Sequence, residues 1–201
     1  MKKLIICSKF EVLVEYNLQL IEKYFSLENF TVVSYNKLDI KVPNIVIKTP
    51  MSKYWTNGLI DFFEGLVDHS FFMMMEDHFL FDYVDTDLFD YGSKQVSTGK
   101  ATKFLCSARL NRGNFTQEYN EDWYKCPKQE HPSTRLIPVS LMPSVWNTKF
   151  FKHILARSKI IIIWDFEVKN YIGILKDVDS NIIYHKTKEV FQVSHLRANN
   201  L

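Results

Sequence analysis

The sequence predicts an α/β protein with a mainly parallel central sheet flanked by helices. Two observations lead to this prediction. Apolar segments rich in β-branched residues alternate with segments of helical periodicity, in the order strand, helix, strand, strand, helix, strand; this order is typical of a parallel sheet covered by helices. In addition, residues 71–75 form an uninterrupted apolar run, which indicates a strand buried on both faces.

Length and composition predict that residues 1–201 form a single domain with a sizeable core. The 46% hydrophobic and 15% aromatic content is typical of a folded globular protein. No apolar run reaches the ~20 residues needed to cross a bilayer. The first apolar stretch ends at Lys9 and is too short for a signal peptide.

The first half of the chain has the clearer pattern. Strands are expected at residues 3–7, 30–35 and 44–48, ahead of the run at 71–75. Two helices are expected between these strands from apolar residues at helical spacing. The residues are Leu13, Tyr16, Leu20 and Tyr24 in the first helix, and Leu59, Phe62, Phe63, Leu66 and Val67 in the second.

The second half of the chain is less regular. A strand is expected over residues 103–110, followed by a polar, loop-like stretch over 111–133. Residues 145–157 have the pattern of a helix, with Ser144 as its expected cap. Residues 160–163 form a second apolar run and predict another buried strand.

Charge is unevenly distributed along the chain. Between Lys53 and Lys94 there is no Lys or Arg but there are nine acids, whereas the rest of the chain carries a net charge of +11. The nine acids are Asp61, Glu64, Asp68, Glu76, Asp77, Asp82, Asp85, Asp87 and Asp90. Such asymmetry favours a cation site beside surfaces that meet an anion, although segregated charge also serves solubility alone.

The three cysteines, Cys7, Cys106 and Cys126, are odd in number and lack the C-x-x-C spacing. They therefore indicate neither a disulfide framework nor a cysteine-based zinc site. A reducing, cytoplasmic location is expected.

Two acidic motifs follow the two apolar runs. Glu76 and Asp77 end the run at 71–75, where an open α/β sheet binds its ligands, and carboxylates there suit a hard divalent cation. Asp165 and Glu167 follow the run at 160–163 and lie on the same side of an extended chain. One of them can serve as a general base, with Trp164 as a flat surface for a sugar or base. Solvated strand ends are the alternative for both motifs.

With these motifs in this order, the chain resembles small GT-A-type glycosyltransferases of bacteria and their viruses. Three segments carry the resemblance, and together they span roughly residues 3–170. The first is Met-Glu-Asp-His-Phe-Leu at 75–80, with Val84-Asp85 after it. The second is Ser-Leu-Met-Pro-Ser-Val-Trp at 140–146, similar to Ser-Leu-Gln-Pro-x-Ile-Trp. The third is Trp-Asp-Phe-Glu at 164–167, similar to Trp-x-x-Glu. The chain departs from the family in lacking a full Asp-x-Asp and in having Met142 in place of Gln.

The resemblance implies transfer of a sugar from a nucleotide-sugar donor, most often a UDP-sugar, to a hydroxyl group. Residues 1–100 would bind the donor and residues 101–201 the acceptor. Asp77, assisted by Glu76 or His78, would hold Mn²⁺ or Mg²⁺. The C-terminal segments around His185 and His195 offer a further ligand or phosphate contacts.

The remaining roles follow from the same resemblance. Ser8 and Lys9 would meet the nucleotide and Arg109 the diphosphate, although a plain turn and a surface ion pair explain these residues equally well. Glu167 would be the general base toward the acceptor, with Asp165 as the second choice.

For the acceptor, the basic remainder of the chain favours hydroxymethylated bases of phage DNA. The cations expected to contact DNA phosphates are Lys94, Lys100, Lys103, Lys186, Lys188 and Arg197, with Trp164 holding an extruded base. A bacterial surface glycan or lipopolysaccharide is the alternative acceptor. A non-catalytic nucleotide- or nucleic-acid-binding protein is the alternative class, although the chain lacks Gly-x-Gly-x-x-Gly and Walker glycines.

Overall fold

The structure of the protein, a computed structural model, describes residues 1–7, 10–48, 55–107, 117–125, 140–157, 181–186 and 188–195. The described helices are α1 (Glu11–Tyr24), α2 (Trp55–Glu64), α3 (Thr86–Ser97) and α4 (Thr148–Arg157). The described strands are β1 (Lys2–Ile6), β2 (Phe30–Ser34), β3 (Asn44–Val46), β4 (Ser70–Met75), β5 (His78–Leu80), β6 (Lys103–Leu105), β7 (Gln117–Glu118), β8 (Trp123–Lys125), β9 (Ser144–Asn147), β10 (Ile182–His185) and β11 (Val193–His195).

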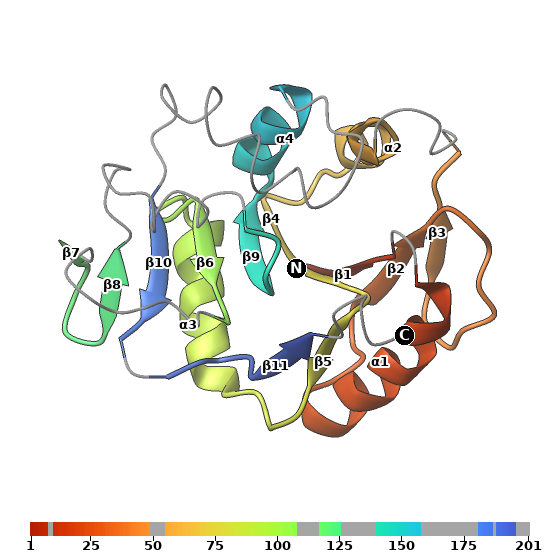
Figure 1. Ribbon diagram of the computed structural model, residues 1–201. Helices are drawn as coiled ribbons and strands as arrows, with labels where there is room; N and C mark the ends of the chain where they lie inside the picture. Colours follow the sequence, from red (N-terminus) through yellow and green to blue (C-terminus); the bar gives the residue numbers. More distant parts are fainter. Residues whose placement is uncertain are drawn as a thin grey trace.

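Most of the strands join one large sheet in the order β3-β2-β1-β4-β9-β6-β10-β8-β7 (Figure 1). Strands β3, β2, β1 and β4 are mutually parallel. Strand β9 is antiparallel to both of its neighbours, and the sheet is mixed from there on. Strands β5 and β11 form a separate antiparallel pair. The predicted α/β class is confirmed, with the parallel part of the sheet in the first half of the chain.

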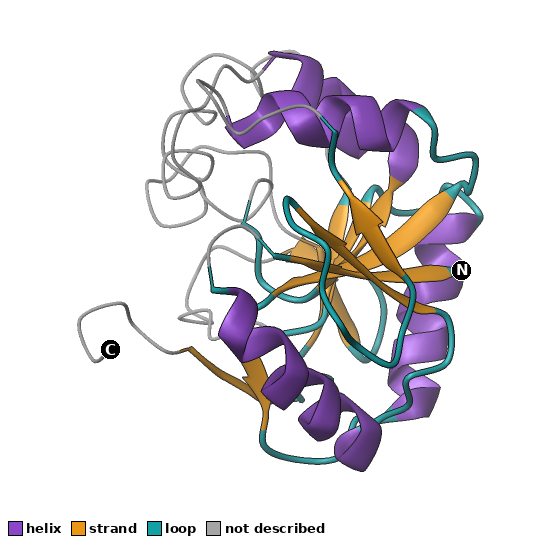
Figure 2. Ribbon diagram, turned by 90° about the vertical axis from the view of Figure 1, so that its right-hand side faces the viewer, coloured by secondary structure: helices purple, strands orange, loops and turns teal. Residues whose placement is uncertain are grey.

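Helices cover both faces of the sheet, α2 and α4 on one side and α1 and α3 on the other (Figures 1 and 2). Strand β4 is buried along its whole length, as its apolar run predicts. Because side chains alternate along a strand, Phe71, Met73 and Met75 pack in the core under α2 and α4. Phe72 and Met74 pack in the core with residues of α1 and α3. No helix of the described residues is long and apolar enough to cross a membrane.

The prediction of a helix over residues 145–157 is wrong at its start. Ser144–Asn147 is strand β9, which pairs with β4 and β6, and the helix begins at Thr148. Ser144 is therefore not the cap; the Asn147 side chain instead accepts a hydrogen bond of 3.0 Å from the Phe150 N–H. The buried Val145 and Trp146 suit a strand between two others. A local sequence pattern does not reveal that β4 and β6 are its partners.

Other elements also differ from the sequence prediction. Helix α2 ends at Glu64, so Leu66 and Val67 lie beyond it. Helix α3, capped by the Asp85 carboxylate through the Leu88 N–H, was not expected. Strands β7 and β8 occupy part of the stretch expected as a loop. The expected strand at 160–163 lies outside the described residues.

The close packing of α3 on β6 leads us to predict that a larger residue at their contact destabilises the fold. A Cβ added at Gly92 would lie 2.4 Å from the Phe104 ring, which is fully buried. We expect Gly92→Ala to lower the free energy of unfolding by about 1–3 kcal/mol, because an overpacked core must shift. Gly65→Ala is the control, since its Cβ would meet Phe62 O at an ordinary 3.6 Å. Urea denaturation of both variants checks this; equal midpoints would contradict it.

Candidate functional site

The candidate site is the turn of Glu76 and Asp77, called here the acid turn, which links β4 to β5. It lies at the carboxyl end of β4, where the Glu76 N–H donates to the Ile6 carbonyl at the end of the neighbouring β1 (3.2 Å). The carboxyl ends of adjacent parallel strands in an open α/β sheet are where ligands bind. The structure thus places both acids at the edge that the sequence predicts.

Glu76 is held inside the protein. Its side chain is buried, and its Oε1 accepts a hydrogen bond of 3.2 Å from the Phe10 N–H at the start of α1. The first N–H groups of a helix lack partners within the helix, and the positive end of the helix dipole favours an anion there. Glu76 therefore joins the acid turn to the amino end of α1.

Asp77 is the more accessible of the two acids, with its side chain 19% exposed. Partial burial and the nearby Glu76 carboxylate raise the pKa of Asp77 to about 6. Both causes disfavour the negative charge. A cation beside Asp77 would reverse the second effect, so the electrostatics of the turn favour a bound positive charge.

His78 has a structural role in this arrangement. Its ring is buried, and its Nδ1 accepts a hydrogen bond of 3.1 Å from the Met75 N–H. A neutral ring that accepts at Nδ1 carries its proton on Nε2, which lies 4.0 Å from Asp77 Oδ1. Neither nitrogen then offers a lone pair to a metal, so this geometry argues against His78 as a metal ligand.

A C-terminal segment, residues 188–195, runs back to the acid turn and ends beside it (Figure 1). Strand β11 pairs with β5 so that the main chain of His195 lies opposite that of His78. Upstream, Phe191 is fully buried and stacks on Phe72 at 4.9 Å between ring centroids. The segment therefore joins the central sheet to the strand that follows the acid turn.

Asn17 on α1 also contacts the acid turn, although sequence reasoning did not select it. Its side-chain amide donates to the carbonyls of Met75 (3.4 Å) and Glu76 (3.1 Å). A signal was present in the sequence, because Asn17 occupies an apolar position of the helix between Leu13 and Ile21. A polar residue at such a position normally has a hydrogen-bonding purpose.

The structure leaves several predicted site residues undescribed. Residues expected to meet the donor, the acceptor or the transferred proton lie outside the described part of the chain; they are Ser8, Lys9, Arg109, Trp164, Asp165, Glu167 and Arg197. Their roles remain predictions.

Three of the described cations that were expected to contact DNA have other partners, whereas Lys94 and Lys100 are exposed. Lys103 is fully buried, donates to the Ser140 carbonyl, and lies 3.9 Å from the Trp146 ring centroid. It therefore cannot contact a DNA backbone. Lys186 is 3.0 Å from Glu118, and Lys188 is 3.3 Å from Asp85.

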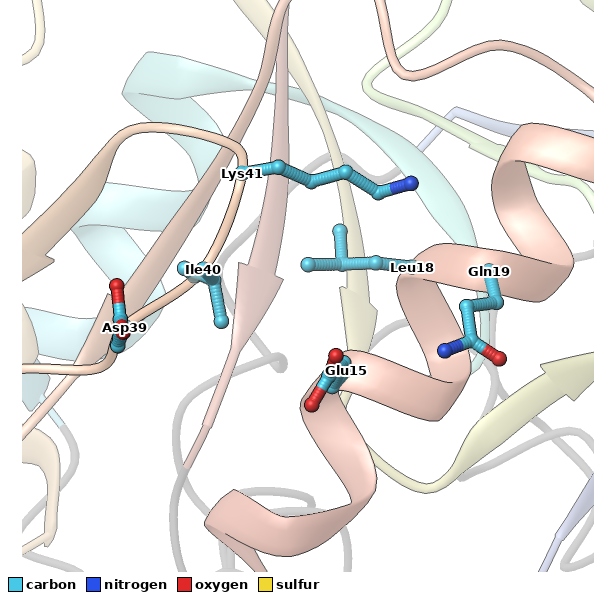
Figure 3. Close-up of a pocket in the computed structure, with 6 residues that line it drawn as sticks. All are labelled: Glu15, Leu18, Gln19, Asp39, Ile40 and Lys41. Carbon is cyan, nitrogen blue, oxygen red and sulfur yellow. The ribbon is translucent and has the colours of Figure 1, made fainter.

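A pocket of about 430 Å³ lies between α1 and the connection from β2 to β3 (Figure 3). Its lining mixes acidic, amide, apolar and basic side chains: Glu15, Leu18, Gln19, Asp39, Ile40 and Lys41. Lys41 also pairs with Glu22. The pocket shares no residue with the acid turn, and its mixed charges select no class of ligand.

The acid turn fits a divalent cation in part. Two adjacent carboxylates offer the oxygen ligands that Mg²⁺ and Mn²⁺ prefer, and the Glu76 carboxylate is, after burial, the second cause of the raised pKa of Asp77. Within the described ranges, however, no three His, Cys, Asp or Glu side chains gather closely enough to hold a metal ion. One or two carboxylates, completed by waters and substrate phosphates, are the usual protein ligands of Mg²⁺.

The described fold places the chain among Rossmann-like α/β proteins. Within that class, it is similar to UDP-glucose pyrophosphorylase complexed with UDP-glucose, with a TM-score of 0.52, 10% identity, and coverage of 96% of this chain and 92% of the other. No protein-family model and no curated protein matches the sequence. At 10% identity the likeness shows the fold and not the activity.

Two larger proteins align with TM-scores below 0.5. The bifunctional IspDF from Campylobacter jejuni is 14% identical, with a TM-score of 0.48, and the alignment covers 96% of this chain and 52% of IspDF. TarS 1-349 from S. aureus in complex with UDP is 13% identical, with a TM-score of 0.49, and the alignment covers 95% of this chain and 59% of the TarS chain. This chain thus spans little more than half the length of either.

Proposed function

We propose that the protein is a glycosyltransferase that moves a sugar from a nucleotide-sugar donor to a hydroxyl group. The observation that carries the proposal is the acid turn at the carboxyl edge of the parallel strands, on a fold similar to that of UDP-glucose pyrophosphorylase. In open α/β sheets this edge is the ligand-binding edge. The motifs at 75–80, 140–146 and 164–167 supply the resemblance to glycosyltransferases.

In this proposal, Asp77 is the main protein ligand of a divalent cation. Glu76 attaches the turn to the start of α1 by accepting a hydrogen bond from the Phe10 N–H. Its negative charge adds to the attraction for the cation. The further ligand would come from the C-terminal segment, where the main chain of His195 lies opposite His78. The chemistry that a bound cation supplies is stabilisation of the negative charge that develops on the leaving diphosphate.

The other proposed roles belong to residues beyond the described ranges. Ser8 and Lys9, which follow β1, would contact the nucleotide, and Arg109 would contact the diphosphate. Glu167 would accept the proton of the attacking hydroxyl, with Asp165 as the alternative base. Trp164 would lie against the acceptor.

The first experiment is a donor panel. Incubating the protein with nucleotide sugars and Mn²⁺ should release nucleoside diphosphate slowly even without an acceptor, because glycosyltransferases transfer some sugar to water. Heat-denatured protein is the control. A non-catalytic nucleotide-binding protein would bind a donor and release nothing.

Nucleotidyl transfer is a second candidate, favoured by the likeness to UDP-glucose pyrophosphorylase over most of both chains. The two reactions break different bonds. A glycosyltransferase breaks the bond between sugar and diphosphate, whereas a pyrophosphorylase forms pyrophosphate from a nucleoside triphosphate and a sugar phosphate. Pyrophosphate release from UTP and glucose 1-phosphate would therefore show that the protein catalyses nucleotidyl transfer and not the proposed sugar transfer.

For the acceptor, we propose a glycan hydroxyl in place of hydroxymethylated DNA. Burial of Lys103 and ion pairing of Lys186 and Lys188 weaken three of the expected DNA contacts. Phe81 and Tyr83 follow β5 on the surface, 49% and 72% exposed. Since a strand rises about 3.3 Å per residue, Phe81 lies within about 15 Å of Asp77. Exposed aromatic groups so close to a candidate site mark a surface for an acceptor, and a glycan ring can pack on them without any phosphate contact.

This choice makes a prediction about DNA. Labelled sugar should reach a bacterial surface glycan and not DNA with hydroxymethylated pyrimidines. Duplex DNA should bind weakly, and Lys186→Ala with Lys188→Ala should leave its salt dependence unchanged, like the exposed control pair Lys37→Ala with Lys41→Ala.

Two results would reverse this choice. The first is label on the modified DNA. The second is DNA affinity that falls steeply with salt and loses about two units of log–log slope in the Lys186/Lys188 variant, since each phosphate contact contributes about 0.9.

A further inference from the structure

Asn17 is a fully buried polar residue on the apolar face of α1. The buried residues beside it on the helix are Leu13, Val14, Leu18 and Ile21. Its amide nitrogen donates to the carbonyls of Met75 and Glu76, at 3.4 and 3.1 Å. Its amide oxygen is buried and has no hydrogen-bond partner among the residues that the structure describes.

The orientation of this amide follows from its partners. Exchanging Oδ1 and Nδ2 would place an oxygen against two carbonyl oxygens, which repel it, so the nitrogen must face the acid turn. The unsatisfied oxygen carries a desolvation cost that a leucine at the same position would not have. An apolar residue would therefore serve packing better, and the two donated hydrogen bonds are what distinguishes Asn17 from it.

These two bonds act on the part of the backbone that directs Asp77. The carbonyls of Met75 and Glu76 belong to the peptide groups on either side of Glu76, and the second of these groups leads into Asp77. Because peptide groups are planar, fixing both carbonyls restricts the rotation of the chain between them. The strands on either side of the turn are held by their own pairing, β4 with β1 and β5 with β11. The hydrogen bonds from Asn17 therefore act on the turn between them.

We propose that Asn17 is a positioning residue, which holds the acid turn in the geometry that presents the Asp77 carboxylate to a divalent cation. The proposal rests on the function proposed above, which assigns that cation to the turn. Asn17 itself touches neither the cation nor the substrate and acts through the backbone. Partners of this kind behind a metal ligand typically change metal affinity or activity by 10–100-fold when they are removed.

The test compares Asn17→Leu with Asn44→Leu. Leucine at position 17 keeps the branching and the number of side-chain heavy atoms and removes both donors. Asn17→Ala is a second variant should the bulkier leucine prevent folding. Asn44 on β3 is the matched control, because its side-chain amide likewise donates two hydrogen bonds, here to groups of β2 (Val32 O, 3.2 Å; Ser34 Oγ, 2.7 Å). Amide hydrogen exchange of residues 75–78 and Mn²⁺ affinity by electron paramagnetic resonance are measured for each protein.

We expect the Asn17 variants to speed exchange at residues 75–78 by at least 10-fold and to weaken Mn²⁺ binding by about 10–100-fold. Asn44→Leu should change neither quantity, even where it lowers the melting temperature. Unchanged exchange in the turn would overturn the proposal, as would faster exchange with undiminished Mn²⁺ affinity. Failure of the wild-type protein to bind Mn²⁺ would instead overturn the cation site of the proposed function, and the exchange rates would still show whether Asn17 holds the turn.

Discussion

Asp77→Asn is expected to lower donor turnover by about 10²–10³-fold, the range seen when one electrostatic stabiliser of a transition state is removed. The substitution preserves the shape of the side chain and removes its negative charge. Asp77 is in a turn and keeps part of its surface in contact with solvent, so the fold should survive. Nucleotide released from the donor, with and without Mn²⁺, gives the rate.

The control for this prediction is Asp87→Asn, which makes the same change of charge at an exposed position on α3. It should leave turnover within about twofold of wild type, because water and salt screen the charge of an exposed carboxylate. Wild-type rates in EDTA equal to those in Mn²⁺ would refute the role of the cation.

The same carboxylate gives the reaction a pH dependence. Burial and Glu76 raise the pKa of Asp77 to about 6, so the carboxyl is mostly ionised above pH 6 and mostly protonated below it. A cation requires the ionised form. Mn²⁺ affinity should therefore fall as the pH is lowered through about 6, and a bound cation should move this transition to lower pH. In Asp77→Asn the transition should disappear.

The sequence was sufficient for strand β4 and its acids because both signals are local. An apolar run of this length is typical of a strand buried on both faces, and each of its residues is buried in the structure. The position of Glu76 and Asp77 follows once the strand ends at Met75. The burial of Glu76 could not be predicted, because it accompanies a contact with the start of α1 that is distant in sequence.

Elements that depend on distant partners were missed. Strand β9 was predicted as the first turn of a helix, since only β4 and β6 on its two sides make it a strand. The pairing of β11 with β5 joins residues more than a hundred positions apart, and nothing in either short segment specifies the other. Tertiary packing decides such elements and overrides local propensity.

Lys103 shows how charge alone misleads in a sequence. A lysine in a basic part of the chain was predicted to meet phosphate, but register places it beside Trp146 on the neighbouring strand. There its ammonium group lies over the indole ring and donates to the Ser140 carbonyl. Cation–π contact and a carbonyl acceptor are the usual ways to bury such a group. Lys103 thus fixes the segment that enters β9.

Glu167→Gln is expected to lower turnover by about 10²–10⁴-fold while donor affinity stays within about twofold of wild type. The range is the usual contribution of a general base. Glutamine keeps the size and hydrogen-bonding shape of the side chain but cannot accept the proton of the attacking hydroxyl. Glu167 lies outside the described residues, so the prediction rests on its place in the Trp-Asp-Phe-Glu segment and on the resemblance stated above.

Two further variants test the alternative base and control for the substitution itself. Asp165→Asn tests the alternative base two residues away, and Glu121→Gln repeats the substitution at an exposed position beside β8. With Glu167 as the base, only Glu167→Gln should reduce turnover of bound donor by the full factor, and raising the pH should not restore it, because glutamine does not ionise. A collapse of donor affinity with normal turnover per bound donor would make Glu167 a binding residue. The proton would then pass to Asp165, and Asp165→Asn would show the loss instead.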